Sequence, residues 1–82
     1  MARATVLYFA SARDLVGRKN EELSFEGNPT AGALLERIVS AHPALMPMKS
    51  SIRLSVNHEL VDSDAAVGDG DEVGVLPPVA GG

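Results

Sequence analysis

One amphipathic helical segment, flanked on both sides by strand-like segments, constrains the fold of this chain most. Residues 30–42 are typical of a helix that Thr30 caps and Pro43 ends. The apolar stripe of this segment comprises Leu34, Leu35, Ile38, Val39 and Ala41. A helix with one apolar face must bury that face on another element. In a chain of 82 residues, a sheet made from the remaining segments is the available partner.

Five segments have the alternation or the β-branched content of strands. They are residues 4–10, 21–25, 52–56, 60–61 and 72–76. The first of them is apolar on both alternating faces, with Val6 and Tyr8 on one and Leu7 and Phe9 on the other. This pattern predicts a strand covered on both sides, at least at its C-terminal end. The order of elements predicts an α+β fold, a mixed sheet of about five strands around one main helix, known as the β-grasp. In it, the first and last strands are central and parallel.

The connections carry turn and cap signals. Ser11–Asp14 fits a capping box and Gly17 a helix stop, which together predict a short helical turn. Residues 26–29 predict a turn, residues 44–51 a loop, and residues 62–71 a polar connection.

Composition and charge exclude several classes of protein. Seven basic residues against eleven acidic ones give a net charge of −4, which predicts no nucleic-acid-binding face and favours a basic partner surface. No segment has the length of a membrane span or the apolar core of a signal peptide, so we expect a cytoplasmic protein. The absence of cysteine excludes disulfides, thiolate metal sites and a cysteine nucleophile.

Candidate catalytic and metal sites are weak. His42 ends the helix and His58 lies in a turn, and neither has a neighbouring nucleophile in the sequence. The acidic residues Asp62, Asp64, Asp69, Asp71 and Glu72 lack the spacing of a calcium loop. We expect a solvated acidic turn, a tight turn at residues 68–70 and no metal.

The sequence ends in an extended Gly-Gly tail, which is its most specific functional feature. We expect a domain at residues 1–76 followed by a flexible tail at residues 77–82, with the carboxylate on Gly82. Gly81 and Gly82 have no Cβ and fit a narrow channel, and the preceding prolines keep the chain extended. Such a tail reaches roughly 20 Å into a partner. The same ending is also typical of a frayed terminus.

Three apolar residues fall where the alternation calls for polar ones. Phe9 lies opposite Val6 and Tyr8, Leu76 lies on the face of Glu72, and Leu60 follows a polar turn. These residues predict a docking surface near the base of the tail. The alternative is that Phe9 and Leu60 complete a small core.

Several segments together resemble the small, sulfur-carrying subunit of molybdopterin synthase, a ubiquitin-like β-grasp family. They are residues 6–10, 12–17, 56–57, 69–73 and 76–82. The resemblance covers nearly the whole chain in order. The strand Asp69–Val73, which leads into a Pro-Pro-x-x-Gly-Gly end, is its most specific part.

The resemblance implies a function as a protein-bound sulfur donor, with no permanently bound cofactor. An adenylyltransferase related to ubiquitin-activating enzymes consumes ATP to adenylate Gly82. A sulfurtransferase system then converts Gly82 to a thiocarboxylate. The tail enters the large subunit, which holds the catalytic groups, and sulfurates cyclic pyranopterin monophosphate to molybdopterin. Two small subunits flank a dimer of large ones in this heterotetramer.

The resemblance also assigns roles to individual residues. Gly82 is the reacting residue, and Val79, Ala80 and Gly81 share its channel. Docking to the large subunit is assigned to Phe9, Leu60, Leu76 and, in the loop near the interface, Arg13. The family often has an aromatic residue where this chain has Val75 or Leu76. Other functions stay open: a sulfur carrier for thiamine, cysteine or tRNA thiolation, a ubiquitin-like modifier, or a β-grasp module with an inert tail.

Overall fold

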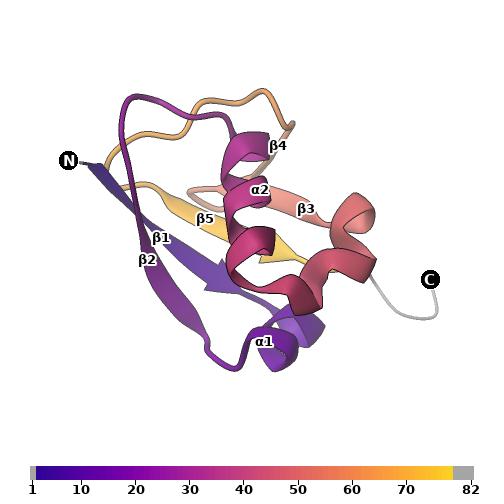
Figure 1. The fold of residues 1–82 in the computed structure, drawn as a ribbon. Coiled ribbons are helices and arrows are strands. Elements are labelled where there is room, and N and C mark those ends of the chain that lie inside the picture. Colours follow the sequence, from indigo (N-terminus) through magenta and orange to yellow (C-terminus); the bar gives the residue numbers. More distant parts are fainter. Residues whose placement is uncertain (1, 79–82) are drawn as a thin grey trace.

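The computed structural model describes residues 2–78 and consists of one sheet with helices packed on one of its faces (Figure 1). The elements in chain order are β1 (Ala2–Tyr8), α1 (Ala10–Val16), β2 (Asn20–Phe25), α2 (Ala31–Ala41), the 3₁₀ helix η1 (Pro43–Ser51), β3 (Arg53–Val56), β4 (Glu59–Val61) and β5 (Glu72–Leu76). Figure 1 shows α2 lying across the sheet, with α1 and η1 near the arrowheads of β1 and β5. No helix among the described residues is long and apolar enough to cross a membrane.

The sheet has the predicted mixed topology. Its strand order is β2-β1-β5-β3-β4, so the first and last strands of the chain are the central neighbours. β1 and β5 run parallel, from the pair Thr5–Glu72 to the pair Tyr8–Val75. The β1–β2, β3–β5 and β3–β4 pairs are antiparallel. The α+β class and the β-grasp arrangement are therefore confirmed.

The core lies between α2 and the inner face of the sheet. Thr30 caps α2 as predicted, because its Oγ1 accepts a hydrogen bond of 3.1 Å from the Ala33 N–H. Along α2 the buried residues are Ala31, Leu34, Ile38 and Val39. Leu35 is half-buried and Ala41 is exposed. The buried stripe therefore begins earlier than predicted, at Ala31, and ends at Val39. Opposite this stripe, Val6, Val73 and Val75 are fully buried.

The prediction that both faces of β1 are covered is wrong. Val6 and Tyr8 are buried, but Leu7 is half-buried and the side chain of Phe9 is 40% exposed. The physical reason is the size of the chain, because its helices are enough to cover only one face of the sheet. The second face, called the open face below, stays accessible and carries apolar residues.

The predicted capping box of α1 is also wrong. The helix begins at Ala10, the N-cap is Phe9 without a side-chain hydrogen bond, and Ser11 lies inside the first turn. The carbonyl of Phe9 accepts hydrogen bonds from the N–H groups of Ala12 and Arg13, so the end of β1 starts the helix directly. The predicted stop is confirmed, because Gly17 has a φ of 86°.

Two connections contain more structure than the sequence pattern predicts. The predicted loop at residues 44–51 lies within η1, whose Leu45 is fully buried. In the connection between β4 and β5, Val67 is fully buried and Ala66 forms an isolated bridge with Thr30. Each connection thus contributes one core side chain, and the sequence around that side chain has no helical or strand periodicity that would predict its burial.

Candidate docking site at the base of the tail

The three predicted docking residues, Phe9, Leu60 and Leu76, lie on the open face and are called the docking patch below. In the sheet, Leu60 pairs with Ser55 on β3, and Ser55 pairs with Gly74 on β5. Paired residues share a face, so this row crosses the open face toward Phe9. The side chains of Phe9 and Leu60 are 40% and 61% exposed, and Leu76 is half-buried. The alternative that Phe9 and Leu60 complete the core is therefore wrong.

Gly74 makes room for the ring of Phe9. A Cβ on Gly74 would lie 3.1 Å from Cε2 of Phe9 and would also collide with Oγ of Ser55. The backbone N–H of Phe9 donates a hydrogen bond of 3.3 Å to the carbonyl of Val75. The ring of Phe9 is thus held over β5, two positions before Leu76 on the same face. This packing fixes the ring near the point where β5 leads into the tail.

Two arginines lie beside the docking patch. Arg13 is exposed on α1, four residues after Phe9, and so lies one helical turn along from it. Arg53 is exposed and pairs in register with Leu76. Sequence reasoning missed Arg53, because a lone arginine at the start of an alternating strand is indistinguishable from an ordinary solvent-facing residue. Only the β3–β5 register shows that it adjoins Leu76.

The described part of the tail is short. Pro77 is half-buried and Pro78 is exposed, and β5 ends at Leu76, the position predicted as the last of the domain. The candidate channel residues Val79, Ala80 and Gly81 and the candidate reacting residue Gly82 lie outside the described residues.

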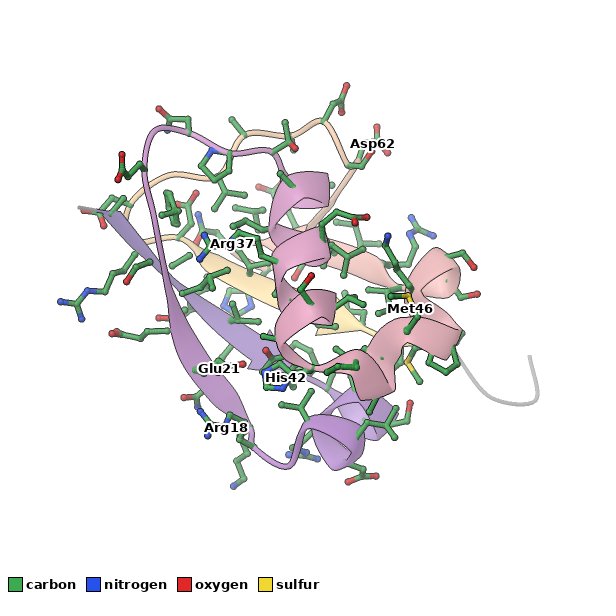
Figure 2. All side chains as sticks on the ribbon, in the orientation of Figure 1. Arg18, Glu21, Arg37, His42, Met46 and Asp62 are labelled. Carbon is green, nitrogen blue, oxygen red and sulfur yellow. The ribbon has the colours of Figure 1, made fainter. Side chains whose placement is uncertain are left out.

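His42 belongs to a polar cluster at the C-terminal end of β1. Figure 2 shows the His42 side chain beside Glu21. Nε2 of His42 lies 2.5 Å from Oε2 of Glu21, and the hydroxyl of Tyr8 donates a hydrogen bond to the same oxygen. The rings of Tyr8 and His42 make an edge-to-face contact, with centroids 5.7 Å apart. Sequence reasoning missed this cluster because its members come from β1, β2 and the end of α2. The cluster joins three elements and explains His42 without catalysis.

The cluster shifts two pKa values. Burial, followed by the hydrogen bond to Glu21, raises the pKa of the Tyr8 hydroxyl well above its ordinary value. Partial burial alone would raise the pKa of the Glu21 carboxyl. The hydrogen bonds from Tyr8 and His42, together with the nearby positive charge of Arg18, outweigh burial and lower that pKa. Ionised Glu21 is therefore the form that the fold prefers.

Glu21→Gln should lower the free energy of unfolding by about 1–2 kcal/mol at pH 7, because the charge-assisted hydrogen bonds are lost. Since the pKa of Glu21 is lower in the folded state, its contribution is complete above the unfolded value of about 4.3. It disappears as the pH falls through the folded value. Urea unfolding at pH 7 and at about pH 3 measures both effects, and the deficit of the variant should shrink at the lower pH.

Glu22→Gln is the matched control for this prediction. Glu22 is exposed, and its Oε1 lies 2.8 Å from a guanidinium nitrogen of Arg3, which is also exposed. Loss of this surface ion pair should lower the free energy of unfolding by less than about 1 kcal/mol. Equal losses in the two variants, or a deficit of Glu21→Gln that does not change with pH, would contradict the structural role of the cluster.

Among the described residues, the acidic side chain of Asp71 stabilises a turn by hydrogen bonding. Oδ2 of Asp71 accepts a hydrogen bond of 2.8 Å from the Gly68 N–H, and its Oδ1 accepts one of 3.1 Å from the Asn57 side chain. The bond from Gly68, followed by that from Asn57, lowers the pKa of Asp71. Gly70 has a φ of 85°, as a tight turn requires. No group of three or more acidic or histidine side chains within residues 2–78 is placed to hold a metal ion.

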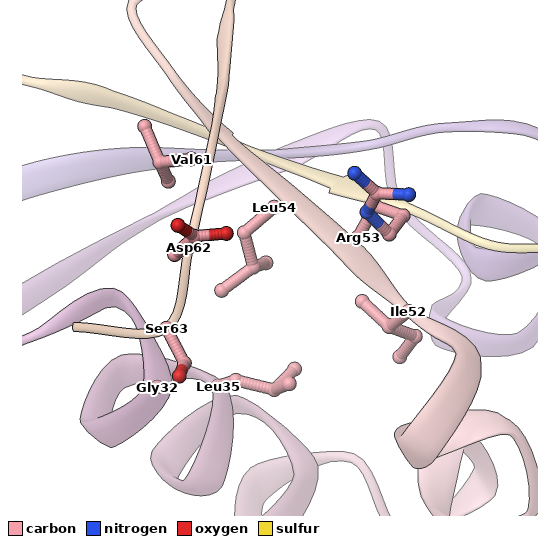
Figure 3. A pocket seen from close by; sticks show the side chains of 8 residues that line it. All are labelled: Gly32, Leu35, Ile52, Arg53, Leu54, Val61, Asp62 and Ser63. Atoms are coloured by element: carbon pink, nitrogen blue, oxygen red, sulfur yellow. The ribbon is translucent and has the colours of Figure 1, made fainter. Parts of the chain in front are cut away.

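A small hollow of about 180 Å³ lies between α2 and the β3–β4 hairpin (Figure 3). Its lining residues are Gly32, Leu35, Ile52, Arg53, Leu54, Val61, Asp62 and Ser63. Figure 3 shows Leu54 between Asp62 and Arg53, and among the described residues no ion pair joins these two. Within residues 2–78, no side-chain hydrogen bond joins the Ser63 hydroxyl to the Asp62 carboxylate, the hydroxyl and the acid that line this hollow.

Comparison with known proteins identifies the family. The ThiS family matches residues 6–82. A molybdopterin synthase sulfur carrier subunit from Chlamydomonas reinhardtii is 35% identical over 79 residues, which cover 94% of this chain and 95% of that protein. The protein of the same name from Escherichia coli is 38% identical over 79 residues, which cover 94% of this chain and 96% of that protein.

A solved structure extends this similarity to the fold. SAMP1 from Haloferax volcanii, the small archaeal modifier protein 1, superimposes with a TM-score of 0.86 at 28% identity. The superposition covers 99% of this chain and 100% of SAMP1. These matches extend over nearly the entire chain and show that it belongs to the ThiS family, together with the molybdopterin synthase sulfur carrier subunits.

Proposed function

We propose that this chain is the sulfur carrier subunit of a molybdopterin synthase. The observation that carries the proposal is its similarity to carriers of that name, which extends over 94% of the chain. The family match also runs through Gly82, so it includes the tail. An exposed apolar docking patch at the base of the tail supports a protein that works by inserting its end into a partner.

The proposed chemistry takes place at Gly82 as the C-terminal residue of the mature protein. Its carboxylate is ionised at neutral pH and is a poor acyl donor. In the first step, a carboxylate oxygen attacks the α-phosphorus of ATP on an activating enzyme, and pyrophosphate leaves. In the second, a hydrosulfide ion delivered by a sulfurtransferase system attacks the acyl carbon, the acyl–oxygen bond to AMP breaks, and the sulfhydryl proton is lost to solvent. The product is a C-terminal thiocarboxylate.

The thiocarboxylate is then the sulfur donor to cyclic pyranopterin monophosphate in the large subunit. We assign to this chain delivery and positioning, and to the large subunit the acid–base groups. The lack of cysteine in the chain fits this division, because no internal thiol competes for the activated carboxyl. No permanently bound cofactor is proposed, and because the activation consumes ATP we propose the cytoplasm as its compartment.

The large subunit is the proposed occupant of the docking patch. Burying the exposed parts of Phe9 and Leu60 would supply the apolar centre typical of a stable interface. Because Gly74 has no Cβ, the Phe9 ring packs against β5 before binding, and a ring that is already packed loses less entropy on association. We propose an assembly in which two small subunits flank a dimer of large ones.

Intact mass spectrometry tests the carrier function directly. After incubation with ATP, the activating enzyme and a sulfur source, the mass of the chain should rise by about 16 Da as sulfur replaces one carboxylate oxygen. Omission of ATP is the control and should leave the mass unchanged. A chain that keeps its original mass in the complete reaction would refute the proposal.

A second candidate function is covalent modification of other proteins. It is favoured by the similarity to the small archaeal modifier protein 1, which covers 96% of this chain. The same activated Gly82 would then be attacked by a lysine amine, and an isopeptide bond would form with release of AMP. Recovery of lysine-linked adducts of this chain from cells would support this function, which is compatible with sulfur transfer. Their absence would contradict this second function.

A further inference from the structure

The basic residues of this chain are concentrated around the base of the tail. Residues 9–20 and 42–53 comprise α1, η1, their connections and the first residues of β2 and β3, and they lie beside the C-terminal ends of β1 and β5 (Figure 1). These two segments contain five of the seven basic residues, namely Arg13, Arg18, Lys19, Lys49 and Arg53, and one acidic residue, Asp14. The other ten acidic residues lie elsewhere in the chain.

Three of these cations have no acidic partner among residues 2–78. Arg18 pairs with Glu21 at 3.3 Å, and Lys49 pairs with Glu36. The ion pairs of the described residues include neither Arg13, Lys19 nor Arg53, and all three side chains are exposed. Their charge is therefore directed to solvent and is available to a partner.

Arg53 and Arg13 adjoin the docking patch from two sides. Arg53 projects from the open face in register with Leu76, and Arg13 lies one helical turn from Phe9. Asp62 lines the same hollow as Arg53, but no ion pair joins them. The apolar centre of the patch thus has a positively charged rim, although the chain as a whole has a net charge of −4.

We propose that the surface receiving the tail carries carboxylates that face this rim, and that Arg53 is a docking residue that selects for them. This inference rests on the proposed function, because it takes the large subunit as the partner. It reverses the expectation from net charge, which favoured a basic partner surface. Opposite charges around an interface raise the association rate and fix orientation more than they raise affinity. The rim would therefore orient the tail toward its channel during the encounter.

The test compares Arg53→Gln with Arg3→Gln. Both variants remove one positive charge from the open face, but Arg3 lies near the other end of β1, where it pairs with Glu22. We expect Arg53→Gln to lower the rate constant for association with the large subunit by about three- to tenfold at low salt. Arg3→Gln should change it by less than about twofold. Stopped-flow fluorescence with a dye-labelled large subunit measures these rates.

Ionic strength gives a second readout. Raising the salt concentration to about 1 M shortens the Debye length to about 3 Å and should remove the difference between the variants. Wild-type binding with equal rates for Arg53→Gln and Arg3→Gln, or faster association of Arg53→Gln, would overturn the inference and leave the carrier function intact. Failure of the wild-type chain to bind the large subunit, together with no gain in mass, would overturn both.

Discussion

Removal of Gly82 is expected to abolish the gain of sulfur completely. The shortened chain still ends in a glycine carboxylate at Gly81, so the reacting group is chemically unchanged. Its acyl carbon, however, is withdrawn by about 3.5 Å, the length of one extended residue. Displacement of that size removes the near-attack geometry with the α-phosphorus of ATP, on which the adenylation rate depends. Intact mass after the complete reaction should show no increase of about 16 Da.

Two controls separate this effect from damage to the fold. The deletion lies beyond β5, so thermal unfolding of the shortened chain should match that of the wild type. A chain with one glycine appended after Gly82 should also fail to gain sulfur, because its carboxylate is displaced in the other direction. A shortened or lengthened chain that still gains sulfur would refute the assignment of Gly82 as the reacting residue.

Phe9→Ala should weaken binding to the large subunit by about 2 kcal/mol or more, which is roughly a 30-fold increase in Kd. The ring is large, is partly exposed and packs over Gly74 at the end of the patch that lies nearest to α1. Because the ring is 40% exposed, its loss should cost the isolated chain much less than truncation of a core residue. Isothermal titration calorimetry measures the affinity, and urea unfolding measures the stability.

Leu15→Ala is the matched control for this prediction. Leu15 is 44% exposed on α1, so truncation there removes a comparable exposed apolar side chain outside the docking patch. It should leave the affinity within about threefold of the wild type, as most interface-remote changes do. Equal losses of affinity in Phe9→Ala and Leu15→Ala would contradict the assignment of the interface to the open face.

The periodic parts of the fold could be predicted from the sequence alone. The alternation in β2 and the stripe on α2 each indicate burial on one face, and the order of the elements predicts the topology. Leu45 and Val67 could not be predicted as core residues, because each belongs to a segment whose apolar residues follow neither the helical nor the strand repeat. The cluster of Tyr8, Glu21 and His42 also depends on contacts between distant segments, which no local pattern contains.

The docking patch was predictable for a related reason. Phe9, Leu60 and Leu76 lie where the alternation predicts polar residues, and a group of apolar side chains on one solvent-facing surface is typical of a site that binds a partner. Arg53 gave no such signal, since an exposed arginine in a strand obeys the alternation. Net charge and the basic rim predict opposite charges for the partner surface, because net charge averages over a surface whose charges are segregated.

The position of β5 has a mechanical consequence. β5 is hydrogen-bonded to β1 on one side and to β3 on the other, and the chain beyond Pro78 continues from it. A pull on the last residues therefore acts along the axis of a central strand. Because interstrand bonds run across that axis, such a pull shears both ladders together and does not open them one bond at a time. Force applied along β5 is therefore shared by the two ladders that hold this strand in the sheet.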